Sequence, residues 1–172
     1  KEIADFKFSR EKSWIIAIIA GLFYSFIPSM LHRTVAGIPE IESLGMVFFW
    51  FAFLFFTFAW KAENRKKQIT FGILAGLFTG AMSFSWGGYR YIYMILSLTI
   101  FVLFLFGKNR EKISVIFSSW IIPALILELL KVKSITAILM GFSDVGFGAF
   151  VWFVILLDIV LSKSKVKEAS FL

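Results

Sequence analysis

Two glutamates one residue apart are the side chains of this sequence best suited to bind a cation. Glu40 and Glu42 lie in a short polar segment between two long apolar runs, together with His32 and Arg33. In extended backbone, residues i and i+2 point to the same side, so both carboxylates can approach one ion. Oxygen ligands suit Mg²⁺ or Mn²⁺, which keep waters and hold substrate phosphates. We therefore predict metal binding by Glu40 and Glu42, with Arg33 able to hold a phosphate; a solvated acidic loop is the alternative.

Composition excludes other kinds of metal site and places the polar segment in a membrane protein. The chain has no cysteine and a single histidine, which rules out thiolate and multi-histidine cages. Of its 172 residues, 59% are hydrophobic. Six apolar stretches approach or exceed the length that crosses a bilayer. We expect spans at about residues 14–31, 44–60, 69–86, 88–106, 113–130 and 135–161.

These spans predict an all-α, polytopic bundle that forms one transmembrane domain segment over residues 1–172, with no soluble domain. Connections rich in lysine and arginine alternate strictly with connections that are poor in them. Fourteen lie in the N-terminal segment, the 61–68 and 107–112 loops and the tail, and four lie in the other three connections. Cytoplasmic loops carry the excess of positive charge. Both ends of the segment should therefore be cytoplasmic and residues 32–43 external.

Patterns within the spans predict how the helices pack. Gly72, Gly76 and Gly80 recur every four residues, which indicates one small-residue face for a closely packed neighbour. The phenylalanines of the 44–60 span surround that helix, which indicates lipid contact.

The last apolar stretch is longer than a bilayer requires. At 1.5 Å per residue it would extend about 40 Å, against a hydrocarbon core of roughly 30 Å. Glycines flank Asp144 within it, so a bend or break there is expected, and Asp144 is a candidate for a midplane polar contact or a substrate pathway. Glu128 and Asp158 lie near span ends, where they can reach water.

The polar segment resembles the second external loop of the oligosaccharyltransferase catalytic subunit, particularly the archaeal single-subunit enzymes. The similarity lies in the order and spacing of Arg33, Gly37, Glu40, Glu42 and Leu44, at the outer end of a membrane helix. About forty residues later, the aromatic–glycine block of that family is matched by residues 85–89, Ser-Trp-Gly-Gly-Tyr. One departure is a glutamate at position 40, where the family usually has aspartate.

This resemblance implies a metal-assisted membrane glycosyltransferase of the GT-C type. Such an enzyme transfers a glycan from a lipid-linked phosphate or pyrophosphate to the asparagine of an Asn-x-Ser/Thr sequon in protein N-glycosylation. Glu40 and Glu42 would bind Mg²⁺ or Mn²⁺, and Arg33 matches the arginine before the acidic motif. The implied partners are the lipid-linked oligosaccharide, the acceptor polypeptide and the membrane, without nucleic acid.

Other parts of the family pattern have no counterpart in this sequence, namely the first-loop acidic motif, a later glutamate motif and the Trp-Trp-Asp block of the soluble domain. We therefore expect a fragment of the membrane domain that is inactive alone and requires the remainder of its chain. Two alternatives stay open: a transporter or channel component with a site at Asp144, and another GT-C glycosyltransferase with a different acceptor.

Overall fold

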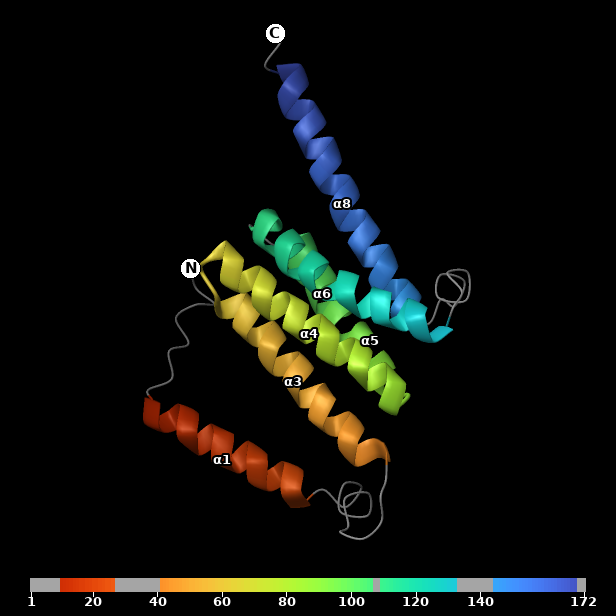
Figure 1. Ribbon diagram of the computed structural model, residues 1–172. Helices are drawn as coiled ribbons and strands as arrows, with labels where there is room; N and C mark the ends of the chain where they lie inside the picture. Colours follow the sequence, from red (N-terminus) through yellow and green to blue (C-terminus); the bar gives the residue numbers. More distant parts are fainter. Residues whose placement is uncertain (1–9, 27–40, 107–108, 133–143, 170–172) are drawn as a thin grey trace. The chain divides into compact units, whose positions relative to one another are not determined.

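The computed structural model describes residues 10–26, 41–106, 109–132 and 144–169. Every regular element in these ranges is an α-helix, which confirms the expected all-α class. The helices, shown in Figure 1, are α1 (Arg10–Phe26), α3 (Ile41–Lys61), α4 (Arg65–Ser85), α5 (Tyr89–Phe106), α6 (Arg110–Val132) and α8 (Asp144–Ala169).

The chain divides into two compact units, residues 1–43 and residues 44–172. The first unit contains α1, whose side chains from Trp14 to Leu22 are all exposed. The second unit contains nearly all of α3 and the whole of α4, α5, α6 and α8, which share one hydrophobic core.

The predicted spans match these helices closely. Five described helices, α3 to α6 and α8, are long and apolar enough to cross a membrane. The ends of α3 to α6 fall within about one helical turn of the predicted spans. Residues 27–31 of the first predicted span and 135–143 of the last lie outside the described residues.

Helices α4 and α6 pack closely because α4 presents its glycine face to α6. A Cβ atom added at Gly72, Gly76 or Gly80 would come within 3.0 Å of α6 atoms, so no larger residue fits at this separation. Close backbone approach is the usual role of small residues between membrane helices. A buried hydrogen bond crosses the same interface, from Trp120 Nε1 to Thr79 Oγ1 (3.0 Å). The predicted packing face is confirmed.

Helices α3 and α4 lie side by side and meet through large aromatic side chains (Figure 1). The ring of Phe78 stacks on those of Phe51 and Phe55, with centroid distances of 5.1 and 5.4 Å. Phe56 is buried and packs edge-on against Trp120 of α6. The predicted lipid contact is therefore wrong for the buried Phe56, whereas it stays a prediction for Phe51, which is 40% exposed beside its stacked neighbour.

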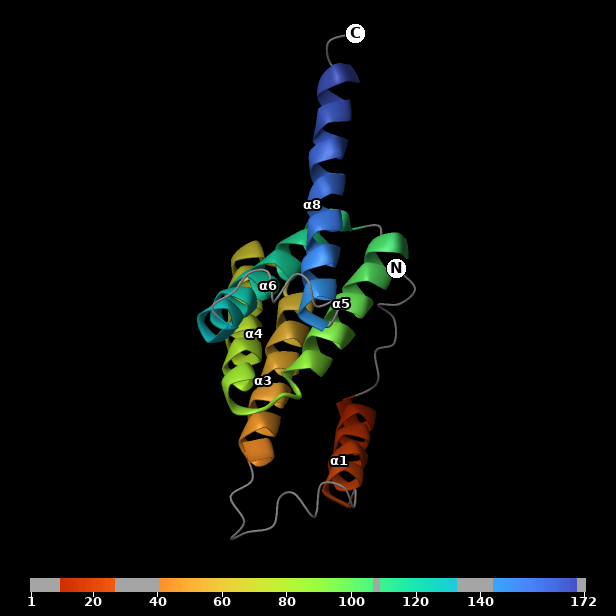
Figure 2. The ribbon, with the colours of Figure 1, turned by 90° about the vertical axis from the view of Figure 1, so that its right-hand side faces the viewer.

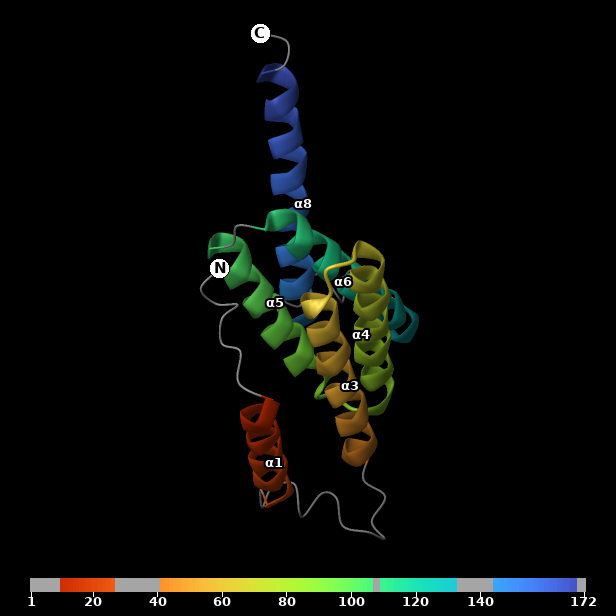
Figure 3. The ribbon, with the colours of Figure 1, turned by 90° about the vertical axis from the view of Figure 1, so that its left-hand side faces the viewer.

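Helix α8 differs from the predicted last span. It begins at Asp144 and continues without a break through Gly146 and Gly148 to Ala169. Gly148 is buried because α5 and α6 side chains approach it, so the glycine serves packing instead of a bend. Within the described residues, the part long and apolar enough to cross a membrane is Val145–Ser162, and the depth of Asp144 stays a prediction. Figures 2 and 3 show α8 continuing past the ends of α3 to α6.

Candidate functional site

Glu42 is the one member of the predicted acidic site that lies among the described residues. Arg33, His32 and Glu40 lie outside them. Glu42 occupies the first turn of α3, and its side chain is partly buried. A carboxylate at this position is stabilised by the positive end of the helix dipole. The second acid of the pair is thus held at a helix end, two residues after Glu40.

The metal itself stays a prediction. Within the ranges that the structure describes, no three histidine, cysteine, aspartate or glutamate side chains gather into a possible metal-binding group. The donor set nevertheless suits Mg²⁺, which proteins usually hold through one or two carboxylates while water and substrate phosphates complete the octahedron. Glu40 and Glu42 stay the predicted ligands of such a cation.

The aromatic–glycine block forms a tight connection between α4 and α5. Helix α4 ends at Ser85, and the Trp86 N–H donates to the Met82 carbonyl (2.8 Å). The Tyr91 N–H then donates to the Gly88 carbonyl (3.1 Å) in the first turn of α5. These backbone bonds define the turn.

The indole of Trp86 packs between two glycines. A Cβ atom added at Gly45 would lie 2.7 Å from the Trp86 Cβ atom, and one at Gly88 would collide with the six-membered ring of the same indole. Both positions therefore require glycine if the indole is to stay in place. Gly45 belongs to α3 and follows Glu42 by three residues. The structure thus packs the aromatic–glycine block against the helix that carries Glu42.

A hollow of about 410 Å³ lies beside this turn. It is lined by Trp86, Gly87, Gly88, Arg90, Tyr91 and Met94. Arg90 and Tyr91 are exposed, so a guanidinium and a phenol face the surrounding medium. An arginine beside glycine backbone and aromatic rings suits an anionic group, because guanidinium matches phosphate and carboxylate geometry.

Glu128 is a buried acid whose setting the sequence analysis did not predict. We expected its side chain to reach water, but it is 2% exposed. Its Oε1 atom accepts a hydrogen bond from the Tyr89 hydroxyl (2.8 Å). An acid within a membrane helix is costly and is kept where a partner or a function requires it. Here the partner is the first residue of α5, directly after the Trp-Gly-Gly turn.

Lys131 adds a second contact from the same end of α6. Its Nζ atom donates to the Ser83 carbonyl (2.6 Å) near the end of α4 and lies 4.7 Å from the centroid of the Tyr89 ring. Helix α6 thereby contacts the residues on both sides of the turn. The spacing of an acid and a lysine three residues apart was visible in the sequence, but its target on α4 and α5 was not.

The other acids of the last two helices play smaller parts. Asp158 forms an ion pair with Arg110 (2.7 Å), which joins α8 to α6, and it is partly exposed, as expected for an acid near a span end. The side chain of Asp144 lies outside the described residues, although its backbone starts α8.

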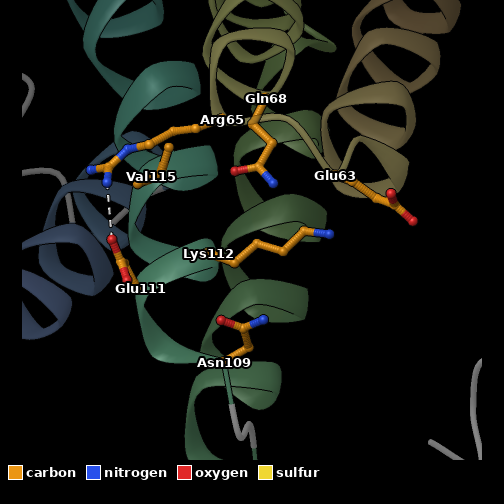
Figure 4. Close-up of a pocket in the computed structure, with 7 residues that line it drawn as sticks. All are labelled: Glu63, Arg65, Gln68, Asn109, Glu111, Lys112 and Val115. Carbon is orange, nitrogen blue, oxygen red and sulfur yellow. Dashed lines mark hydrogen bonds and ion pairs between the residues drawn. The ribbon is translucent and has the colours of Figure 1, made fainter.

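A polar pocket of about 400 Å³ lies at the opposite end of α4, where α4 and α6 begin (Figure 4). Arg65 and Glu111 form an ion pair across it (3.0 Å), and both side chains are mostly exposed. Exposed pairs of this kind contribute little to stability. Two acids and two basic residues line the pocket, and it lies on the predicted cytoplasmic side, where Glu63 follows the C-terminal end of α3. It is not the candidate catalytic site.

A comparison with protein families matches nearly the whole chain. The family model described as "Oligosaccharyl transferase STT3, N-terminal" covers residues 3–171. No solved structure matches the chain.

Curated relatives give the same result. The chain is 27% identical over 118 residues to the dolichyl-diphosphooligosaccharide–protein glycosyltransferase subunit STT3 of Saccharomyces cerevisiae, covering 68% of this chain and 16% of that protein. It is 24% identical over 128 residues to the Dictyostelium discoideum subunit, covering 74% and 17%. It is 29% identical over 120 residues to the Schizosaccharomyces pombe subunit, covering 69% and 15%. The chain thus spans about one sixth of the length of these relatives, and the archaeal subtype stays a prediction.

Proposed function

The chain belongs to the oligosaccharyl transferase STT3 family, and from this premise we propose that it forms part of the catalytic subunit of an enzyme of protein N-glycosylation. The match of the family model to residues 3–171 carries the proposal. The five membrane-crossing helices agree with a multi-pass membrane enzyme.

The proposed reaction moves a glycan from a lipid-linked phosphate or pyrophosphate to an asparagine within an Asn-x-Ser/Thr sequon. The bond between the anomeric carbon and the phosphate oxygen breaks, and a bond to the side-chain amide nitrogen forms with loss of a proton. Negative charge develops on the leaving phosphate. Stabilising that charge is the main electrostatic task of such a site.

Three residues of this chain would stabilise the negative charge on the departing phosphate. Glu40 and Glu42 would hold Mg²⁺ or Mn²⁺, which offsets negative charge on the leaving group. Arg33 would bind a phosphate oxygen or orient a carboxylate, since its planar guanidinium can donate two parallel hydrogen bonds. The position of Glu42 in the first turn of α3, next to the Gly45–Trp86 contact, supports this assignment.

The proposed topology places this site outside the cytoplasm. Both ends of the segment would be cytoplasmic and residues 32–43 external, because basic residues gather in alternate connections. The remainder of the protein, including a first external loop and a soluble domain, would complete the site. The 172 residues alone would then be inactive.

The test uses the full-length enzyme with a lipid-linked oligosaccharide and a sequon peptide. Glu40→Gln combined with Glu42→Gln should abolish metal-dependent transfer, because glutamine removes both negative charges and keeps the size of each side chain. Glu63→Gln is the matched control, since Glu63 is exposed at the opposite end of α3 and should tolerate the change. Unchanged transfer by the double variant would refute the site assignment, and absence of transfer by the unaltered enzyme would refute the function.

A further inference from the structure

Glu128, the buried acid of α6, is linked to α3 through the turn between α4 and α5. We propose that Glu128 is a positioning residue: through the Tyr89 hydroxyl it fixes the Trp86–Tyr89 turn against α3 and thereby sets the affinity for the lipid-linked donor. This inference rests on the proposed function.

The first step of the argument is the burial of the hydrogen bond. Glu128 is 2% exposed and Tyr89 is 6% exposed, so water does not compete for either group. A hydrogen bond that water cannot replace holds its two groups in one geometry, because breaking it leaves the buried Glu128 without an equivalent partner. The 2.8 Å bond therefore fixes the start of α5 to α6.

The second step is the contact that Lys131 makes on the other side of the turn. Lys131 donates to the Ser83 carbonyl and lies over the Tyr89 ring, so α6 holds the end of α4 as well as the start of α5. Both flanks of the turn are thus tied to one helix end. With its flanks held, the turn can move little as a unit.

The third step connects the turn to α3, the helix that carries Glu42. The Trp86 indole fills the space beside Gly45, so a displacement of the turn displaces the N-terminal part of α3 or loses this contact. Glu42 lies in the first turn of that helix. Contacts therefore link Glu128 to Tyr89, and the turn that includes Trp86 to α3. In the proposed function, the N-terminal end of α3 would lie next to the donor phosphate.

Two substitutions separate the hydrogen bond from the charge of the acid. Glu128→Gln keeps an oxygen that can accept from Tyr89, whereas Glu128→Leu removes it. Tyr89→Phe removes the donor from the other side. Thr99→Val is the matched control, because it also removes a hydroxyl from α5 and Thr99 is exposed and lies outside the lining of the hollow beside the turn.

The experiment measures transfer kinetics of the full-length enzyme for donor and peptide separately. Glu128→Leu and Tyr89→Phe should each raise the donor KM by about three- to tenfold, the range expected for loss of one buried hydrogen bond. The peptide KM should stay unchanged. Glu128→Gln and Thr99→Val should keep the donor KM within about twofold of the unaltered enzyme, which is less than the loss of that bond would give.

Amide hydrogen exchange supplies a second measurement that does not depend on activity. Exchange of residues 83–91 should accelerate in Glu128→Leu and Tyr89→Phe and stay unchanged in Glu128→Gln and Thr99→Val. A role in folding alone would lower the apparent kcat with an unchanged donor KM, and that result would overturn the proposal. So would a loss in Glu128→Gln equal to that in Glu128→Leu, since the charge would then matter and the hydrogen bond would not. If the unaltered enzyme transfers no glycan, the proposed function fails, while the exchange data still test the contact.

Discussion

The close packing of α4 on α6 predicts opposite effects for the same substitution at two glycines. In Gly76→Ala, the added methyl group would meet the backbone carbonyl oxygen of Trp120 and lie 2.6 Å from Pro123 Cγ. Ordinary contact begins at 3.4 Å, so the helices would have to separate locally by roughly 1 Å. A gap of that size forfeits a large part of the dispersion energy of the neighbouring contacts.

The magnitude follows from two opposing terms. Overpacking of this kind costs about 1–3 kcal/mol. Alanine favours the helix over glycine by about 1 kcal/mol, which leaves a net destabilisation of up to about 2 kcal/mol. The Trp120 carbonyl belongs to the α6 backbone and cannot rotate away. At Gly21 of α1, an added Cβ atom has no neighbour within 4 Å, so Gly21→Ala should be neutral or stabilising.

The assay is the free energy of unfolding of the chain in detergent micelles, measured by titration with sodium dodecyl sulfate and followed by circular dichroism. The two variants should shift the unfolding free energy in opposite directions and differ by about 2 kcal/mol. Equal stabilisation by Gly76→Ala and Gly21→Ala would refute the reasoning, because it would show that the α4 and α6 backbones do not approach as closely as described.

Three further outcomes follow from the same structure. Thr79→Val should destabilise the chain by about 1–3 kcal/mol, because the buried Trp120 indole loses its acceptor. In a double-mutant cycle, Trp120→Phe should lower the unfolding free energy less in the Thr79→Val background than it does alone. Glu111→Gln should change the unfolding free energy by less than about 1 kcal/mol at any salt concentration, since its ion pair is exposed. Because the chain contains no cysteine, single cysteines at Glu63 and Tyr91 can be labelled with a membrane-impermeant maleimide; they should react from opposite sides of the membrane, and reaction from one side would contradict the proposed topology.

Much of the architecture could be predicted because it depends on properties that are local in sequence. An apolar run of about 20 residues forms a membrane helix whatever its neighbours are, since a helix lets its backbone N–H and C=O groups form all their hydrogen bonds within the segment. The spans at 44–60, 69–86, 88–106 and 113–130 therefore agree with α3 to α6. The glycine face of α4 was readable for the same reason, because its four-residue spacing is fixed by helix geometry. The acidic pair and Arg33 were found through residue types and spacing, and they stay predictions.

Contacts between helices could not be predicted in the same way, because apolar side chains in a bilayer face either lipid or protein at similar cost. Periodicity could not tell that the Phe51 and Phe55 rings stack on Phe78, nor that α8 passes through its glycines unbroken. The burial of Glu128 is the clearest case. Its position near a helix end suggested exposure, yet the start of α5 covers it and supplies its hydrogen bond. The sequence by itself determined the helices, their glycine face and the candidate acids, whereas only the tertiary structure decided which acid is enclosed and which turn it holds, since that depends on residues 39 positions apart meeting in space.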